Sequence, residues 1–252
     1  MIHFIGAGPG AADLITVRGA ELLRNADVVI YAGSLVNPAL LESVKPGCEV
    51  RNSALMTLEE VVSVMEAAHR AGKDVARLHS GDPCLYGAVR EQMDALDKRG
   101  IPWDVTPGVS SFCGAAAALG AEYTLPGVSQ SVILTRMPGK TPVPDTERLR
   151  TLAACGTSLV IFLSGGMPDA VQTELLQSGG YVPDTPAAIV YKATWDDENI
   201  IRCTVGTLAD AAKRAGIRKH ALILVGDFLC ASGGRSRLYD PSFTTEYRKG
   251  AL

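Results

Sequence analysis

The chain lacks the residue patterns that hold structural metals or disulfides. Its 252 residues include six cysteines and four histidines, all widely scattered, and no cysteine pair has metal-ligand spacing. A reducing compartment disfavours disulfides, so we expect most of these cysteines to be small core residues. The sequence therefore predicts neither a metal site nor a disulfide framework.

Long apolar runs and an excess of basic charge are also missing. No segment approaches the roughly 20 apolar residues that a membrane helix requires. The first residues, Met-Ile-His-Phe-Ile-Gly, show no basic region ahead of an apolar run, so we expect a cytoplasmic protein without membrane contact. The formal net charge of −3 disfavours nucleic acid as a partner, although a local basic group could still bind a small anion.

The composition does provide for a large core. Hydrophobic residues make up 47% of the chain and charged residues 20%, which is typical of a globular protein. The length allows one large domain or two small ones. No internal repeat or low-complexity run is visible, so the hydrophobic pattern must decide the domain organisation.

Strands and helices alternate in the first half of the chain. Short apolar segments predict strands at 2–5, 27–31, 73–79 and 103–106. Apolar residues at helical spacing predict helices at 13–25, 58–71, 88–98 and 112–119. This alternation predicts parallel strands joined by right-handed crossovers.

The second half follows a different pattern, after a linker with proline and glycine at 122–128. It predicts strands at 131–136, 159–163, 187–191, 200–205 and 221–228, and helices at 146–154, 169–177 and 208–215. The interval between the third and fourth of these strands is too short for a crossover helix, which predicts an antiparallel hairpin and a mixed sheet. We therefore expect two α/β domains, residues 1–121 and 129–252, with a cleft between them.

Three loops in the first half follow predicted strands directly. They are GAGPG at 6–10, SGDP at 80–83 and TPGVSS at 106–111. In alternating α/β chains, ligands bind beyond the carboxyl ends of the strands, where these loops lie. The first loop departs from the dinucleotide pattern G-x-G-x-x-G, because Pro9 interrupts it and the final glycine is absent. The three loops predict a ligand site of another kind.

The SGDP turn follows the strand that we expect at the centre of the sheet. Gly81 would let backbone amides approach a ligand closely, and Pro83 would stiffen the turn. Asp82 would place an acceptor there for hydroxyls or an amine. An ordinary turn with an aspartate cap is the alternative explanation for the same residues.

Together, the three loops resemble the tetrapyrrole methyltransferase family, whose members transfer a methyl group from S-adenosyl-L-methionine to a porphyrin-like ring. The resemblance continues through 159–163, 188–194 and 221–226, so it covers nearly the whole chain. It implies a homodimer in which each subunit has two α/β domains and a folded cofactor in the cleft between them. S-adenosyl-L-homocysteine would be the second product.

The stretch VIYAGSLVNP at 29–38 discriminates within the family. Many relatives that methylate uroporphyrinogen carry an acidic residue soon after the tyrosine, whereas this chain has Ala32-Gly33-Ser34. This version resembles the members that convert precorrin-4, or its cobalt-containing counterpart, to the C11-methylated product in cobalamin synthesis. Methylation of uroporphyrinogen III or of C20 or C17, a diphthine synthase acting on a protein histidine, and a non-catalytic tetrapyrrole-binding protein remain alternatives. The sequence leaves the presence of cobalt open.

The matching motifs also imply which residues bind the cofactor. They are Pro9, Ser80, Gly81, Asp82, Leu85, Ser110, Ser111, Leu163, Ala193 and Gly226. Leu163 stands where relatives often carry methionine, and Ala193 where some carry glycine. Both changes keep a small or apolar surface at the cofactor.

The ring carboxylates of such a substrate require basic groups, and arginine binds carboxylates in a bidentate manner. Candidates near predicted strand ends or glycine loops are Arg18, Arg51, Arg77, Arg136 and Lys140. Arg136 and Lys140 are the first choice, because they flank a Met-Pro-Gly turn just beyond the linker. Gly8, Gly10 and Ser34 complete the predicted substrate site.

No catalytic acid or base is assigned. Attack of an electron-rich ring carbon on a sulfonium methyl group needs mainly alignment of the two reacting atoms. The chain accordingly shows no Ser-His-Asp or Cys-His pattern. His79 and Asp82 lie beside the cofactor turn, where we expect a packed histidine and a binding carboxylate.

Overall fold

A computed structural model describes residues 1–230 and 236–250, except for the side chain of Ser34. The chain forms two compact units. The first comprises Met1–Ala115 with Lys192–Glu198, and the second Ala116–Tyr191 with Asn199–Leu252. The division falls inside a helix, and the boundary predicted at 122–128 stays a prediction.

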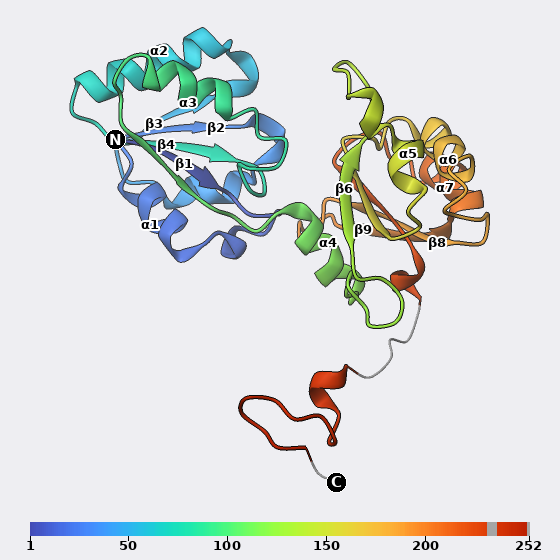
Figure 1. Ribbon diagram of the computed structural model, residues 1–252. Coiled ribbons are helices and arrows are strands. Elements are labelled where there is room, and N and C mark those ends of the chain that lie inside the picture. Colours follow the sequence, from blue (N-terminus) through green and yellow to red (C-terminus); the bar gives the residue numbers. More distant parts are fainter. Residues whose placement is uncertain (231–235, 251–252) are drawn as a thin grey trace. The chain divides into compact units, whose positions relative to one another are not determined.

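The first unit contains a five-stranded sheet in which every strand is parallel to its neighbours. Its order is β3-β2-β4-β1-β5, with β1 Ile2–Gly6, β2 Val28–Tyr31, β3 Glu49–Asn52, β4 Val75–His79 and β5 Trp103–Thr106. The prediction of parallel strands is confirmed, and β4 lies at the centre of the sheet as expected (Figure 1). The edge strand β3 was not predicted, because only one of its four residues is apolar.

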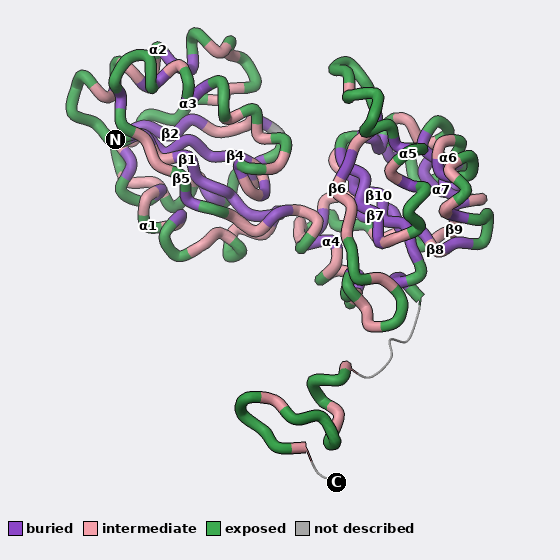
Figure 2. Tube along the Cα trace, in the orientation of Figure 1, coloured by how far each residue is buried: buried purple, intermediate pink, exposed green. Residues whose placement is uncertain are grey.

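Helices cover both faces of this sheet. They are α1 Val17–Asn25, α2 Leu58–Arg70 and α3 Arg90–Asp97, whereas α4 Ser111–Leu119 spans the division between the two units. A capping box between Thr57 and Glu60 begins α2, whose Val61 and Met65 pack on one sheet face. Leu23 of α1 packs on the opposite face. The strands β1, β2 and β4 are buried along most of their length (Figure 2).

The second unit contains a mixed sheet of order β6-β7-β10-β8-β9. Its strands are β6 Val132–Arg136, β7 Ser158–Phe162, β8 Pro186–Tyr191, β9 Asn199–Thr204 and β10 Ala221–Val225. Only β6 and β7 are parallel, and β8 pairs with β9 as an antiparallel hairpin. Both predictions are confirmed. The helices α5 Leu149–Ala153, α6 Pro168–Leu176 and α7 Leu208–Arg214 pack their apolar residues against this sheet.

Several predicted elements end earlier or start later in the structure. β10 stops at Val225, three residues before the predicted end, because Gly226 takes a positive φ of 138°. β7 stops before Leu163, which also has a positive φ, of 53°. The helix predicted at 13–25 is interrupted, and α1 begins only after Thr16, whose hydroxyl accepts a hydrogen bond from Gly19.

The segment Lys192–Glu198 connects β8 to β9 but is grouped with the first unit. We call it the arm. Nothing in the alternation of strands and helices indicates such a segment. Across the described parts of the chain, no helix has the length and apolar character needed to cross a membrane.

Candidate functional site

The three glycine-containing loops meet beyond the carboxyl ends of β1, β4 and β5. The N–H of Ala7 donates to the carbonyl of His79 at 2.8 Å. Gly8 and Gly81 exchange two backbone hydrogen bonds, at 3.2 and 2.8 Å, which join the first two loops. Because β1 lies between β4 and β5, all three loops emerge side by side. The structure thus brings the three sequence motifs together at one edge of the sheet.

The loops cross so closely that glycine is required at the crossing. A Cβ added to Gly6 would lie 2.5 Å from the Cα of Gly108, and one added to Gly108 would lie 2.2 Å from the carbonyl oxygen of Gly81. Gly81 has a φ of 63°, and its added Cβ would lie 3.4 Å from the backbone of Ser110. The TPGVSS loop therefore packs beside Gly81, and the approach of a ligand to the backbone of Gly81 stays a prediction.

Asp82 ties the second loop to the third. Its Oδ1 accepts from the N–H of Cys84 at 2.8 Å, and its Oδ2 accepts from the N–H of Gly108 at 2.9 Å. Partial burial raises the pKa of Asp82, but hydrogen bonds from Cys84 and Gly108 outweigh it and hold the pKa below its usual value. The expected acceptor for a ligand is therefore already engaged in holding the two loops together.

The remaining predicted cofactor contacts of the first unit lie on the same loops. Ser80 directly follows β4 and is half-buried, and the N–H of Leu85 donates to the carbonyl of Asp82 at 3.3 Å. Ser110 is buried, while Ser111 is the first residue of α4. The TPGVSS loop therefore leads directly into the N-terminus of α4, next to the loop crossing.

The arm packs on the GAGPG turn. A Cβ on Gly10 would lie 2.2 Å from Cδ1 of Trp195 and 2.7 Å from the carbonyl oxygen of Ala193. Pro9 packs against Gly114 of α4, where an added Cβ would lie 2.8 Å from the proline ring. Ala193 entered the predicted site through the resemblance, whereas Trp195 carries no sequence signal that singles it out.

Two further predicted cofactor contacts lie in the second unit. Leu163 follows β7, and 65% of its side chain is exposed although leucine favours burial. Its positive φ adds local strain, which proteins retain where the side chain must point in a set direction. Gly226 follows β10, and an added Cβ would lie 3.2 Å from the ring of Phe228.

The predicted basic residues differ in their availability. Arg136 donates to three backbone carbonyls, those of Met137, Thr141 and Pro142, at 3.2, 3.2 and 2.6 Å. Its guanidinium therefore closes its own turn. Lys140 is exposed and makes no hydrogen bond or ion pair with any described residue. Ser34 lies in the 3₁₀ helix Gly33–Leu35, and its side chain falls outside the described part of the structure.

Arg77 is wrong as a candidate for binding a ligand. It is 6% exposed, and it donates to Gln92 and to the carbonyls of Ile30 and Leu78. Burial lowers the pKa of Arg77 to about 10. Of the other two candidates, Arg51 pairs with Glu49 and Arg18 lies exposed in α1.

His79 is a packed residue, as expected. Its ring is 3% exposed and lies 6.0 Å from that of Phe4, and its Nε2 has no hydrogen-bond partner. Burial lowers the pKa of His79 to about 3, and the positive charge of Arg77 adds to the effect. The histidine is therefore neutral at physiological pH and holds its loop through the carbonyl of Gly87.

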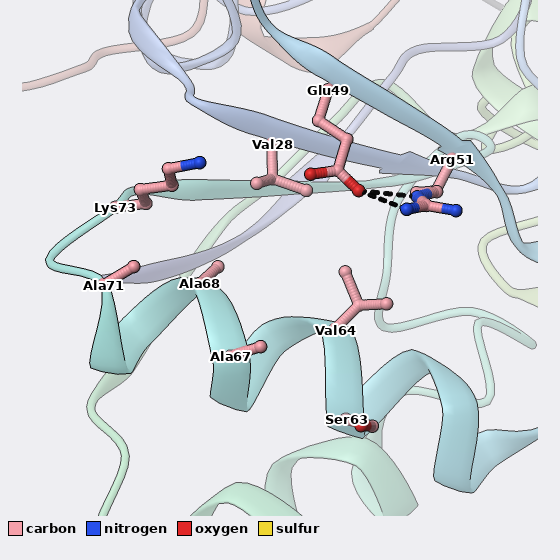
Figure 3. Close-up of a pocket in the computed structure, with 9 residues that line it drawn as sticks. All are labelled: Val28, Glu49, Arg51, Ser63, Val64, Ala67, Ala68, Ala71 and Lys73. Atoms are coloured by element: carbon pink, nitrogen blue, oxygen red, sulfur yellow. Dashed lines mark hydrogen bonds and ion pairs between the residues drawn. The ribbon is translucent and has the colours of Figure 1, made fainter.

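A groove of about 280 Å³ lies elsewhere in the first unit, between α2 and the β2–β3 edge (Figure 3). Glu49 and Arg51 form an ion pair along one wall, and Ala67 and Ala68 of α2 form the other. Of the residues singled out from the sequence, Arg51, one of the candidate basic groups, lines this groove, and none of the predicted cofactor contacts does. Within the described residues, no three His, Cys, Asp or Glu side chains are grouped so that they could hold a metal ion. The expectation of a metal-free site stays a prediction.

The first unit carries glycine-rich loops beyond the carboxyl ends of a parallel sheet, which is where α/β proteins bind ligands. The sequence profile of the tetrapyrrole (corrin/porphyrin) methylases matches residues 1–209, so the chain belongs to this family of methyltransferases. The family resemblance and the fold class expected from it are confirmed.

Relatives match over nearly the full chain. The cobalt-precorrin-4 C(11)-methyltransferase of Methanocaldococcus jannaschii is 51% identical, over 98% of this chain and 96% of its own length. The precorrin-4 C(11)-methyltransferase of Pseudomonas aeruginosa is 45% identical, over 99% of both chains.

Solved structures agree with this assignment. A cobalt precorrin-4 methyltransferase superposes with a TM-score of 0.89 at 49% identity, covering 91% of this chain and 96% of its own. The uroporphyrin-III C-methyltransferase of Thermus thermophilus, solved with S-adenosylhomocysteine, has a TM-score of 0.75 at 26% identity. That match covers 91% of this chain and 93% of the other.

Proposed function

We propose that this protein transfers a methyl group from S-adenosyl-L-methionine to C11 of precorrin-4, or of cobalt-precorrin-4, in cobalamin synthesis. The observation that carries the proposal is the 51% identity, over 249 residues, to an enzyme named for that reaction. The AGSLVNP stretch supports the same choice among ring positions. Relatives of both kinds, named with and without cobalt, are similar at 45–51% identity, so the metal content of the ring stays open.

S-adenosyl-L-methionine, when bound, supplies an electrophilic methyl group. Its S–CH₃ bond breaks on transfer, and S-adenosyl-L-homocysteine is the leaving group. The residues of this chain fit such a ligand. The crossing of Gly6, Gly81 and Gly108 holds together the three loops that would supply backbone groups, and Leu163 exposes an apolar side chain suited to a sulfonium or an adenine ring. We propose the ten implied cofactor contacts, from Pro9 to Gly226, as the cofactor site.

The protein's contribution to the reaction is alignment and exclusion of water. A ring carbon provides the electron pair, so no residue has to generate a nucleophile. His79 is buried and neutral and has a structural role, and Asp82 holds two loops together. Neither is proposed as an acid or a base.

Lys140 is the preferred candidate for binding the ring carboxylates, and Arg136 is the second choice. The ammonium group of Lys140 is exposed, whereas both terminal nitrogens of Arg136 already donate to carbonyls. Gly8, Gly10 and Ser34 are proposed to contact the ring. The family resemblance further supports a homodimer, and the lack of a visible signal sequence supports a cytoplasmic location.

Replacing Leu163 by glycine separates stability from cofactor binding. The free energy of unfolding should stay unchanged or rise by about 1 kcal/mol, because glycine accepts a positive φ without strain. The Kd for S-adenosylhomocysteine should rise about tenfold, since the apolar contact is lost. Thermal unfolding and calorimetry measure the two effects. Val182→Ala, at another exposed apolar residue of the same unit, is the control and should leave the Kd unchanged. An unchanged Kd for Leu163→Gly would remove Leu163 from the site.

Methyl transfer is tested with purified protein and three substrates: precorrin-4, cobalt-precorrin-4 and uroporphyrinogen III. One added methyl group, together with release of S-adenosylhomocysteine, is expected by mass spectrometry for one or both of the first two and not for the third. Activity on the metal-free ring should survive exhaustive chelation. Tight binding of the ring without transfer would favour the non-catalytic alternative.

A further inference from the structure

One peptide group in the GAGPG turn is held from both sides. The carbonyl oxygen of Gly10 accepts from Nδ2 of Asn37 at 2.9 Å. The N–H of Ala11 donates to Oγ1 of Thr194 at 3.0 Å. This carbonyl and this N–H belong to the same peptide group, so two side chains from distant parts of the chain hold a single plane.

That peptide needs such support, because glycine precedes it. With no Cβ at Gly10, the plane between Gly10 and Ala11 could rotate at little steric cost. A rotated plane would point the carbonyl away from Asn37 and the N–H away from Thr194. Both hydrogen bonds therefore stabilise the same orientation, and loss of either one weakens the other.

The arm holds Thr194 in a conformation that this residue type rarely adopts. Thr194 has a φ of 70°, and a positive φ is a genuine outlier for a β-branched residue. The strain is held by a hydrogen bond from the N–H of Thr194 to Glu198 at 2.6 Å and by an ion pair between Lys192 and Asp197 at 2.6 Å. Such retained strain points to a functional position.

The side chain of Asn37 makes two hydrogen bonds with different segments of the backbone. Its Oδ1 accepts from the N–H of Ala39 and caps the 3₁₀ helix Pro38–Ser43, while its Nδ2 reaches Gly10. Asn37 belongs to the AGSLVNP stretch, which by resemblance points to the precorrin-4 branch of the family. This stretch therefore contacts the GAGPG turn directly, through one side chain.

We propose that Asn37 and Thr194 are positioning residues, which fix the Gly10–Ala11 peptide so that the GAGPG turn presents one backbone surface to the tetrapyrrole. The proposal rests on the proposed function for its ligand. Preorganising a backbone surface lowers the cost of binding the ring and aligning it. Neither side chain itself reacts.

Hydrogen exchange tests the peptide without any ligand. Asn37→Asp keeps the oxygen that caps the helix but turns a carboxylate toward the carbonyl of Gly10. Exchange of the Ala11 amide, followed by NMR, should become at least tenfold faster although the variant does not touch that amide. Asn25→Asp is the matched control, since Asn25 also donates to a backbone carbonyl, that of Glu21, at 2.9 Å. Ala11 exchange that is unchanged in Asn37→Asp would overturn the proposal.

Kinetics test the consequence for the ring. Asn37→Asp and Thr194→Val should each raise the KM for the tetrapyrrole about 5- to 10-fold, the effect of losing one hydrogen bond. The Kd for S-adenosylhomocysteine should stay within twofold, and Thr194→Ser, which keeps the hydroxyl, should restore the KM. A change in the Kd with an unchanged KM would overturn the assignment to the tetrapyrrole. If the proposed function is wrong, the wild-type protein will not transfer a methyl group to these rings. The faster exchange of the Ala11 amide in Asn37→Asp would still be expected in that case.

Discussion

Replacing Gly108 by alanine is expected to disrupt the loop crossing and to abolish binding of S-adenosylhomocysteine. The added methyl group would lie 2.2 Å from the carbonyl oxygen of Gly81 and 2.7 Å from the Cα of Gly6. Both neighbours are backbone atoms at strand ends, so neither can move without breaking the contacts between the loops. The free energy of unfolding should fall by about 3 kcal/mol, near the upper end for overpacking.

Gly165→Ala is the matched control for this substitution. Gly165 is buried, whereas Gly108 is half-buried, but an added Cβ at Gly165 would meet only ordinary contacts, the nearest at 3.6 Å from Ala221. Chemical denaturation should show a change below about 1 kcal/mol for this variant. Wild-type stability and cofactor affinity in Gly108→Ala would mean that the three loops do not cross as described.

His79 is expected to make the stability of the protein depend on pH in mildly acidic solution. Burial, with the charge of Arg77, lowers its pKa to about 3 from its usual 6.5. Between these values the unfolded chain binds a proton at His79 and the folded chain does not, so the free energy of unfolding falls as the pH falls. From pH 7 to pH 5 the loss due to His79 should be about 2 kcal/mol.

Denaturation of His79→Leu at the two pH values measures this contribution. The variant should lose about 2 kcal/mol less than wild type between pH 7 and pH 5, whatever its absolute stability. His69→Gln, which removes a histidine from α2, should keep the wild-type loss. Asp82 has a lowered pKa and therefore stabilises the fold at pH values above its usual pKa. This contribution is lost only as the pH falls below that value, outside the range from pH 7 to pH 5. Equal pH dependence in His79→Leu and wild type would show that His79 takes up its proton over the same pH range in the folded and the unfolded state, so that burial does not lower its pKa.

Much of the fold could be predicted because its elements repeat a simple pattern. The strand at 103–106 has the predicted bounds, and the short interval between β8 and β9 correctly indicates a hairpin. The polar edge strand β3 could not be found, since its exposed residues need not be apolar. The helix after the SGDP turn begins only at Arg90, because Tyr86 and Ala88 take positive φ values that no residue pattern indicates.

The position of the three loops could be predicted. Strand ends marked the three loops, and the structure places them in contact. Sequence spacing could not show that both carboxylate oxygens of Asp82 accept hydrogen bonds from backbone amides. It also could not show that Arg136 donates to carbonyls of the turn that follows it, because such bonds depend on the tertiary fold. The position of the arm could not be predicted either. Trp195 follows Gly10 by 185 residues in the sequence, yet its side chain packs against Gly10.

The position of the transferred methyl group tests the central claim most directly. The protein is incubated with precorrin-4 or cobalt-precorrin-4 and S-adenosyl-L-methionine labelled with ¹³C at its methyl group, and the product is studied by NMR. The label should be attached to C11 of the ring. A label on another ring carbon, or no transfer under conditions in which a related C11-methyltransferase is active, would contradict the proposed function.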